Sequence, residues 1–156
     1  MKGNAKLIAT LNSLLADELT AINQYMVHSE MCDNWGYARL HKIDEKRAID
    51  EMKHAEKLIG RILFLEGKPI VSNLGAITIG QEVPKQVAND LHLENGAVKN
   101  YNEAIILAGE VKDYATRDLL QGILNDEDAH VNVLEEQLDQ LAQLGVQQYL
   151  GQQIKE

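Results

Sequence analysis

Two Glu-x-x-His motifs occur in this chain, and each follows a single glutamate at the same distance. The two sets, offset by 76 residues, are Glu18, Glu51 and His54, and Glu94, Glu127 and His130. In both sets the second glutamate lies 33 positions after the first, and the histidine follows three positions later. Four carboxylates and two imidazoles at this spacing are typical of a di-iron or di-manganese carboxylate site inside a four-helix bundle. The pattern predicts redox chemistry with iron and oxygen.

The internal repeat extends beyond these six residues. The same offset of 76 also pairs Leu15 with Leu91, Ala21 with Ala97, Ile22 with Val98, Tyr25 with Tyr101, Asp50 with Asp126, Leu58 with Leu134, Ile62 with Leu138, and Leu65 with Leu141. Most of these pairs are apolar and follow the face of each segment that is predicted to be buried. We interpret the repeat as two helical hairpins related by a pseudo-two-fold axis, which would place two nearly equivalent metals side by side.

Helical periodicity is clear in four long segments. Apolar residues recur at spacings of three, four and seven, which is typical of amphipathic helices. The segments run from about 5 to 32, 36 to 65, 84 to 110, and 114 to 144. The tail, residues 146–153, is predicted to add a short fifth helical piece. Asn34 is predicted to cap the second helix, and Pro84 suits the first turn of the third.

The connections between these segments differ in length. The first and third connections are short, so they predict antiparallel hairpins. The middle connection, residues 66–83, spans roughly 60 Å when extended, whereas a 28-residue helix is about 42 Å long. It can therefore cross the whole bundle and leave the second and third helices parallel. Residues 73–79 alternate enough for a short extended stretch, but we do not predict a sheet.

Composition limits the other possibilities. With 156 residues the chain is predicted to be one domain, residues 1–156. The net charge of -9 argues against a nucleic-acid partner and suits a protein that attracts cations. The only cysteine, Cys32, allows neither an intrachain disulfide nor a Cys-x-x-Cys metal site, and it suits a cytoplasmic location. We expect neither a signal peptide nor a membrane span.

The candidate metal ligands interrupt the apolar stripes of the predicted helices. Burying ionised side chains is unfavourable unless they are paired or bind a metal. Carboxylate and imidazole ligands favour iron or manganese over metals that prefer thiolates. We expect one terminal glutamate and one histidine for each metal, with Glu18 and Glu94 terminal. The glutamates of the two motifs, Glu51 and Glu127, would bridge the metals.

Four further residues follow from the repeat. Tyr25 and Tyr101 lie two turns beyond a terminal glutamate on the same helix face. Each is either a core tyrosine or a group that hydrogen-bonds a ligand or donates an electron nearby. Asp50 and Asp126 point about 100° away from the adjacent glutamate. They are surface acids, cavity-facing groups or hydrogen-bond partners of the ligands.

The remaining candidates have no counterpart in this pattern. His28, His41 and His92 are predicted to be surface residues. Met52 points away from the metal face and, together with Ile49, makes an apolar patch on the outer face of the second helix. Such a patch indicates a subunit interface. A thioether can also serve as an axial haem ligand, and a symmetric dimer would supply Met52 twice.

Several segments together resemble the bacterioferritin family over essentially the full chain. They are the opening Met1 to Gly3, Asp17 to Leu19 with Ala21 to Tyr25, Ile49 to Ala55, Arg61 to Gly67, and Asp126 to His130. The resemblance implies a ferritin-like bundle with one long crossover. It also implies a ferroxidase centre of two iron ions bound by the six repeated ligands.

The resemblance carries further implications. It implies one haem b held by Met52 from each subunit of a two-fold dimer. It implies a hollow shell of 24 subunits that stores ferric mineral, with the short C-terminal helix near the four-fold axes. Fe(II) would be oxidised by O₂ or H₂O₂, and a ferredoxin-type donor is a possible partner for iron release. Asp50 would face the cavity, although Lys46 stands where some relatives have a histidine.

Alternative functions remain open at this point. A manganese catalase or an oxygenase would need extra chain for substrate or donor docking. A rubrerythrin-like peroxidase usually adds a Cys-x-x-Cys module, which is absent from this sequence. A DNA-protecting mini-ferritin places its metal sites between subunits. A metal-free helical interaction protein would not explain six ionisable residues on apolar stripes.

Overall fold

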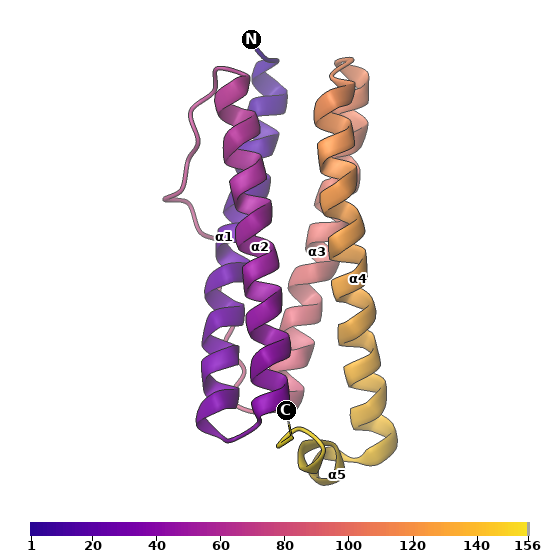
Figure 1. Ribbon diagram of the computed structural model, residues 1–156. Helices are drawn as coiled ribbons and strands as arrows, with labels where there is room; N and C mark the ends of the chain where they lie inside the picture. The colour runs from indigo at the N-terminus through magenta and orange to yellow at the C-terminus, as the bar shows by residue number, and fades with distance from the viewer. Residues whose placement is uncertain (156) are drawn as a thin grey trace.

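The computed structural model describes residues 1–155 and consists of four long helices and one short helix, with no strand in this range (Figure 1). The helices are α1 (Ala5–Asn34), α2 (Ala38–Phe64), α3 (Val83–Glu110), α4 (Tyr114–Leu144) and α5 (Val146–Gly151). The predicted all-α, ferritin-like bundle with one long crossover and a short C-terminal helix is confirmed.

The crossover makes α2 and α3 parallel, whereas α1–α2 and α3–α4 are antiparallel hairpins (Figure 1). Polar side chains of α1 hold the crossover along the bundle by hydrogen bonds to its backbone. Asn12 Nδ2 donates to Lys68 O (3.0 Å), and Asn12 Oδ1, Thr20 Oγ1, Gln24 Oε1 and His28 Nε2 accept from the backbone N–H groups of Ile70, Gly75, Thr78 and Gly80 at 2.8–3.0 Å. These hydrogen bonds therefore fix the crossover, which has no regular secondary structure, along α1.

The helix ends follow the expected local chemistry in most places. Asn4 caps α1 by accepting from Leu7 N (3.0 Å), Pro84 lies in the first turn of α3, and Gly145 ends α4 with φ +79°. The prediction that Asn34 caps the second helix is wrong, because Asn34 is the last residue of α1. The chain reverses at Gly36, which has φ +83° and so ends α1 before α2 can begin.

Lys112, in the turn between α3 and α4, has φ +61°, a left-handed conformation that favours glycine. We expect Lys112→Gly to raise the free energy of unfolding by roughly 0.5–1 kcal/mol, because the substitution removes the steric cost of a Cβ in this conformation. Lys99→Gly, at an exposed position within α3, should lower it by about 1 kcal/mol. Thermal unfolding of both variants checks the pair, and equal shifts would contradict the assignment of strain to Lys112.

The core is divided into two large apolar clusters, one toward each end of the bundle. The first includes Leu11, Leu58, Ala104 and Leu120, and the second, beside α5, includes Val87, Leu134 and Tyr149. The middle of the bundle lies between them, at the level of the predicted metal ligands.

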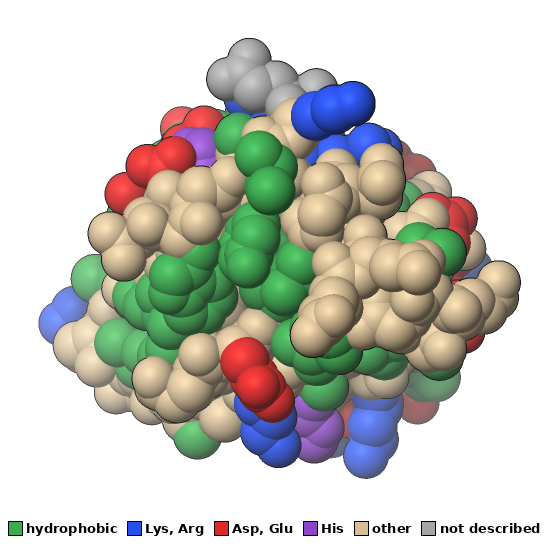
Figure 2. Space-filling model, turned by 90° about the horizontal axis from the view of Figure 1, so that it is seen from below, with side chains coloured by type: hydrophobic (Ala, Val, Ile, Leu, Met, Phe, Trp, Pro, Cys, Tyr) green, Lys and Arg blue, Asp and Glu red, His purple; other side chains and the backbone are tan. Residues whose placement is uncertain are grey.

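At the α5 end, hydrophobic side chains gather near the middle of the surface and charged ones lie toward its edge (Figure 2). The exposed apolar residues of this end include Leu144, Val146 and Ile154. An apolar surface of this kind is typical of a protein that buries it against a partner.

Candidate metal centre

The six repeated glutamates and histidines meet in the middle of the bundle. They come from all four long helices: Glu18 from α1, Glu51 and His54 from α2, Glu94 from α3, and Glu127 and His130 from α4. The relative exposure of each is between 0% and 9%. Three-residue spacing puts the glutamate and histidine of each motif on the same helix face, so each motif presents both groups to the interior.

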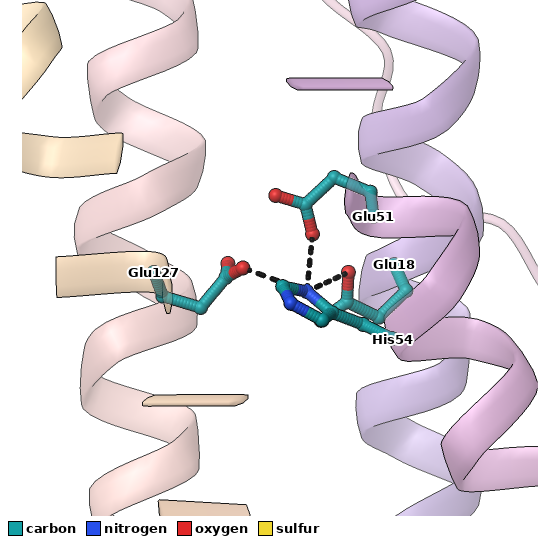
Figure 3. A group of neighbouring side chains, drawn as sticks. All are labelled: Glu18, Glu51, His54 and Glu127. Atoms are coloured by element: carbon teal, nitrogen blue, oxygen red, sulfur yellow. Dashed lines mark hydrogen bonds and ion pairs between the residues drawn. The ribbon is translucent and has the colours of Figure 1, made fainter. Parts of the chain in front are cut away.

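The first half of the centre surrounds the Nδ1 atom of His54 (Figure 3). This nitrogen lies 3.0 Å from Glu127 Oε1, 3.2 Å from Glu51 Oε2 and 3.6 Å from Glu18 Oε2. Three carboxylates from three helices therefore converge on one imidazole nitrogen.

The second half repeats this geometry around the Nδ1 atom of His130. This nitrogen lies 2.9 Å from Glu51 Oε1, 3.4 Å from Glu94 Oε1 and 3.6 Å from Glu127 Oε1. Glu51 and Glu127 therefore belong to both halves, whereas Glu18 and Glu94 each belong to one. This sharing is the arrangement that two bridging and two terminal carboxylates would require.

Each histidine is held from behind by an aspartate of the other hairpin. His54 Nε2 lies 2.9 Å from Asp126 Oδ2, and His130 Nε2 lies 3.1 Å from Asp50 Oδ2. An aspartate that accepts from Nε2–H leaves the Nδ1 lone pair facing the centre. A carboxylate is a usual partner for the ring N–H of a metal-binding histidine. Of the roles left open for Asp50 and Asp126, the structure shows hydrogen bonding to the candidate ligands. Lys46 also binds Asp50, at 3.0 Å.

The two tyrosines form a second reciprocal pair of contacts across the hairpins. Tyr25 donates to Glu94 Oε1 (2.6 Å), and Tyr101 donates to Glu18 Oε1 (2.5 Å). Both rings are fully buried. Each terminal glutamate therefore has one oxygen held by a phenol. Glu18 turns its other oxygen, Oε2, toward His54, whereas Glu94 Oε1 both accepts from Tyr25 and lies 3.4 Å from His130 Nδ1.

The polar atoms that remain without partners indicate what the centre can bind. Among residues 1–155, the buried atoms without a well-directed hydrogen bond include Glu18 Oε2, Glu51 Oε1, Glu94 Oε2, Glu127 Oε1 and His130 Nδ1, although other groups of the centre lie close to several of them. Leaving so many buried acceptors unsatisfied is strongly unfavourable, and four carboxylates cannot all remain ionised together in such a small space. A pair of divalent cations would satisfy both requirements, so this ligand set fits two divalent metal ions.

Protons replace such cations in the metal-free protein. Burial and the neighbouring Glu18 and Glu94 raise the pKa of Glu127 to about 9, although a hydrogen bond with His54 opposes this. Burial alone would lower the pKa of His54, but hydrogen bonds to Glu127 and Glu18 outweigh burial and raise it to about 10. Burial also raises the pKa of Glu51 well above its ordinary value.

These shifts predict that the metal-free protein loses stability as the pH rises. Between the ordinary pKa of Glu127, 4.5, and its folded value of about 9, the folded state keeps a proton that the unfolded state has released. His54 acts in the same direction between 6.5 and about 10. We expect the Tm of metal-free protein to fall from pH 6 to pH 9 and the Glu127→Gln variant to show a shallower fall. A Tm that rises over this range would contradict the prediction.

The sequence predicted His28 to be a surface residue, and this is wrong. His28 is 0% exposed, and its Nδ1 lies 2.9 Å from Asp90 Oδ1. Because Gly80 N–H donates to His28 Nε2, the ring hydrogen is on Nδ1 and points to Asp90. His92 is exposed as predicted, and His41 is partly buried.

His28 belongs to a buried polar network next to the metal centre. Gln24 Nε2 donates to Asp90 Oδ1 (2.8 Å), and Arg47 Nη1 lies 3.3 Å from Asp90 Oδ2 and 3.5 Å from Asp44 Oδ1. The Arg47 guanidinium also lies over the Tyr25 ring, 5.2 Å from its centroid. The network therefore contacts the phenol that holds Glu94.

The internal repeat could have revealed this network. Shifted by 76 residues, Asp44, Arg47, His28 and Asp90 correspond to Leu120, Ile123, Ala104 and Leu14, all of which are buried apolar residues. A polar residue whose repeat partner is a core residue indicates a buried polar group. The two ends of the bundle therefore differ chemically, although their helices and candidate ligands are nearly symmetric.

Comparison with known proteins agrees with this geometry. Residues 8–144 match the ferritin family, described as the ferritin-like domain. The chain is 41% identical to the bacterioferritin of Brucella melitensis biotype 1 over 149 residues, which cover 96% of this chain and 92% of the relative. The chain belongs to the bacterioferritin family.

Two further bacterioferritins show similar agreement. That of Mycolicibacterium paratuberculosis is 41% identical over 152 residues, covering 97% of this chain and 96% of the relative. That of Rhodobacter capsulatus is 42% identical over 147 residues, covering 94% and 91%. The resemblance to the bacterioferritin family is therefore confirmed, and membership supports a role in iron storage.

An exposed apolar patch on α2 bears on the assembly of this chain. Met52 is 50% exposed and Ile49 is 41% exposed, on the outer face of α2. An exposed thioether beside apolar side chains is available to a group outside the subunit. No helix in the described range is both long and apolar enough to cross a membrane.

Proposed function

We propose that the protein is a ferroxidase that oxidises Fe(II) to Fe(III) and stores the product as ferric mineral inside a hollow shell. The observation that carries the proposal is the sharing of Glu51 and Glu127 between two buried ligand groups within a single chain. A mini-ferritin site between subunits would not need all six ligands in one bundle. The balanced reaction is 4 Fe(II) + O₂ + 4 H⁺ → 4 Fe(III) + 2 H₂O, and H₂O₂ is an alternative oxidant.

Each residue of the centre has a role in this proposal. Glu51 and Glu127 contact both Fe(II) substrates, and their two oxygens let the ions stay close while the charge changes. Glu18 with His54, and Glu94 with His130, each complete the ligands of one ion. Divalent iron binding displaces the protons that Glu127 and His54 hold in the metal-free protein.

A cavity beside the centre supports this role. It has a volume of about 360 Å³ and is lined by residues of α1 and α3, by all four carboxylates of the centre and by Gly75, Ala76 and Thr78 of the crossover. Asp17 adds a further carboxylate to its wall. The cavity gives Fe(II) and the oxidant a place to approach the ligands.

The proposal includes one haem b for each two-fold dimer. The exposed Met52 fits an axial ligand, because its thioether lies on an apolar outer face rather than in the core. Two copies of α2 related by a two-fold axis would supply two such ligands. The haem would carry electrons for iron release, with a ferredoxin-type protein as the donor. Met52→Leu should remove the haem absorption bands from purified protein while Fe(II) oxidation continues.

We also propose that the whole chain, residues 1–156, acts as one domain and assembles into a cytoplasmic shell of 24 subunits. Leu144, Val146 and Ile154 at the α5 end, and Ile49 and Met52 on α2, give two separate apolar surfaces. A closed shell needs more than one kind of contact, because a single self-complementary surface stops at a dimer.

The experiment that tests the proposal is aerobic addition of several hundred Fe(II) per particle to iron-free protein, followed by size-exclusion chromatography with iron detection. Iron that elutes with a large particle supports storage. Oxidation that stops after about two irons per chain, with the excess precipitating, would favour a di-iron oxidase instead.

A further inference from the structure

A second group of potential metal ligands lies on the surface of the α1–α2 hairpin. Glu30 of α1 and His41 and Glu45 of α2 each offer one ligand atom, and these atoms lie within 4.8 Å of one another. His41 is partly buried, whereas both glutamates are exposed. The positions that correspond by the internal repeat are Ile106, Arg117 and Gln121, so this group is not a copy of the buried centre.

The His41 ring is held in one orientation by Ser29, which is 2% exposed. The Ser29 hydroxyl donates its only hydrogen to the His41 backbone oxygen (3.0 Å). His41 Nδ1 lies 2.9 Å from Ser29 Oγ and 3.1 Å from Ser29 O, and both oxygens can only accept from it. The ring hydrogen is therefore on Nδ1, and Nε2 faces Glu45 Oε2 at 3.6 Å.

In its neutral form the ring thus directs the Nε2 lone pair toward Glu45, and a Glu30 oxygen belongs to the same group of ligand atoms. Acceptors this close together repel one another unless a cation lies among them, and a proton on Nε2 or a metal ion would relieve this repulsion. Metal-binding histidines usually donate their other ring N–H to a fixed acceptor, as His41 does to Ser29. Ligand atoms about 2.0–2.2 Å from one ion lie no more than about 4.4 Å apart, close to the separations found here.

We propose that Glu30, His41 and Glu45 bind a divalent transition metal of the Zn²⁺ or Fe²⁺ class, with water in the remaining positions. One imidazole and two carboxylates suit a borderline cation better than Ca²⁺ or Mg²⁺. The ion would join α1 to α2 beside the hairpin turn and would offset two of the negative charges of the chain. Glu45 is seven residues from Met52 on the same side of α2, about 10 Å along the helix, so the site lies near the edge of the Met52 patch.

Zn²⁺ is the probe for the test, with the full-length assembled protein. Calorimetric titration should show one Zn²⁺ fewer per chain for His41→Ala and for Glu45→Gln than for the wild type. Glu136→Gln, which removes an exposed charge on α4, should leave the stoichiometry unchanged. Crystals grown with Zn²⁺ should show an anomalous peak among the three side chains. Glu45→Gln leaves the Ser29 contacts intact, so it separates metal binding from the fold of the hairpin.

Two outcomes would contradict the proposal that these three residues bind a metal. Unchanged stoichiometry in both variants with no anomalous peak would mean that His41 carries a proton on Nε2 and forms only an ion pair with Glu45. A peak of equal height in Glu45→Gln would mean that Zn²⁺ sits on the histidine without the carboxylates. Neither outcome affects the buried centre, whose Zn²⁺ binding the same titration reports separately.

Discussion

Replacing Glu127 by alanine should slow aerobic Fe(II) oxidation by at least about 100-fold, the upper end of the effect of losing a group that merely supports a metal ligand. Glu127 belongs to both halves of the centre, with Oε1 3.0 Å from His54 Nδ1 and 3.6 Å from His130 Nδ1. Its loss therefore weakens both ion positions at once. Both ions must be present together, because reduction of O₂ in two-electron steps needs one electron from each.

Stopped-flow absorbance of the ferric product, at two Fe(II) per subunit, measures the rate, and oxygen uptake gives the stoichiometry. The matched control is Asp128→Ala, which removes the adjacent carboxylate from the exposed side of α4. Circular dichroism of the iron-free variants separates loss of chemistry from loss of fold. A Glu127→Ala protein that oxidises iron as fast as the Asp128→Ala control would show that the centre is not the ferroxidase site.

The helices could be predicted closely because each buries a regular apolar stripe. The predicted ends of the four long segments lie within three residues of the observed ones. The candidate ligands were also identifiable, because ionisable residues interrupted those stripes at equal distances in both halves. The residues that hydrogen-bond these ligands could be predicted from the sequence less directly. The Tyr25–Glu94 and Asp126–His54 contacts join different hairpins, so they depend on how the hairpins pack rather than on spacing within one helix.

The polar network was missed for a different reason. The repeat directed attention to positions that match, whereas Arg47, Asp90 and His28 have apolar partners in the other half. A charged residue considered alone is usually at the surface, and only the packed structure shows that Arg47 pairs with Asp90, which also accepts from His28. The same limit applies to His41, whose two carboxylate neighbours come together through the α1–α2 turn.

The same network makes Arg47 the residue with the largest expected effect on stability. Arg47 is 3% exposed and is the cation that faces Asp90 and Asp44. Arg47→Met keeps much of the length of the side chain but leaves a buried carboxylate without its charge partner, which typically costs about 3–5 kcal/mol. Asp44 can relieve part of this by taking up a proton, since burial raises its pKa to about 7. Asp90 still accepts from Gln24 and His28, so its charge stays in the core.

The double variant Arg47→Met/Asp90→Asn separates charge from packing. The amide that replaces the Asp90 carboxylate can still accept from Gln24 and His28 through its oxygen, but it carries no charge. We therefore expect the double variant to regain most of the lost free energy of unfolding. Such strong non-additivity is expected only for residues in direct contact. Thermal unfolding of metal-free protein at one fixed concentration measures all variants, and Lys57→Met, an exposed position on α2, should change stability by no more than about 0.5 kcal/mol. If the two single effects simply add, the charge of Arg47 does not hold this end of the bundle together, and its packing on Tyr25 must account for the loss.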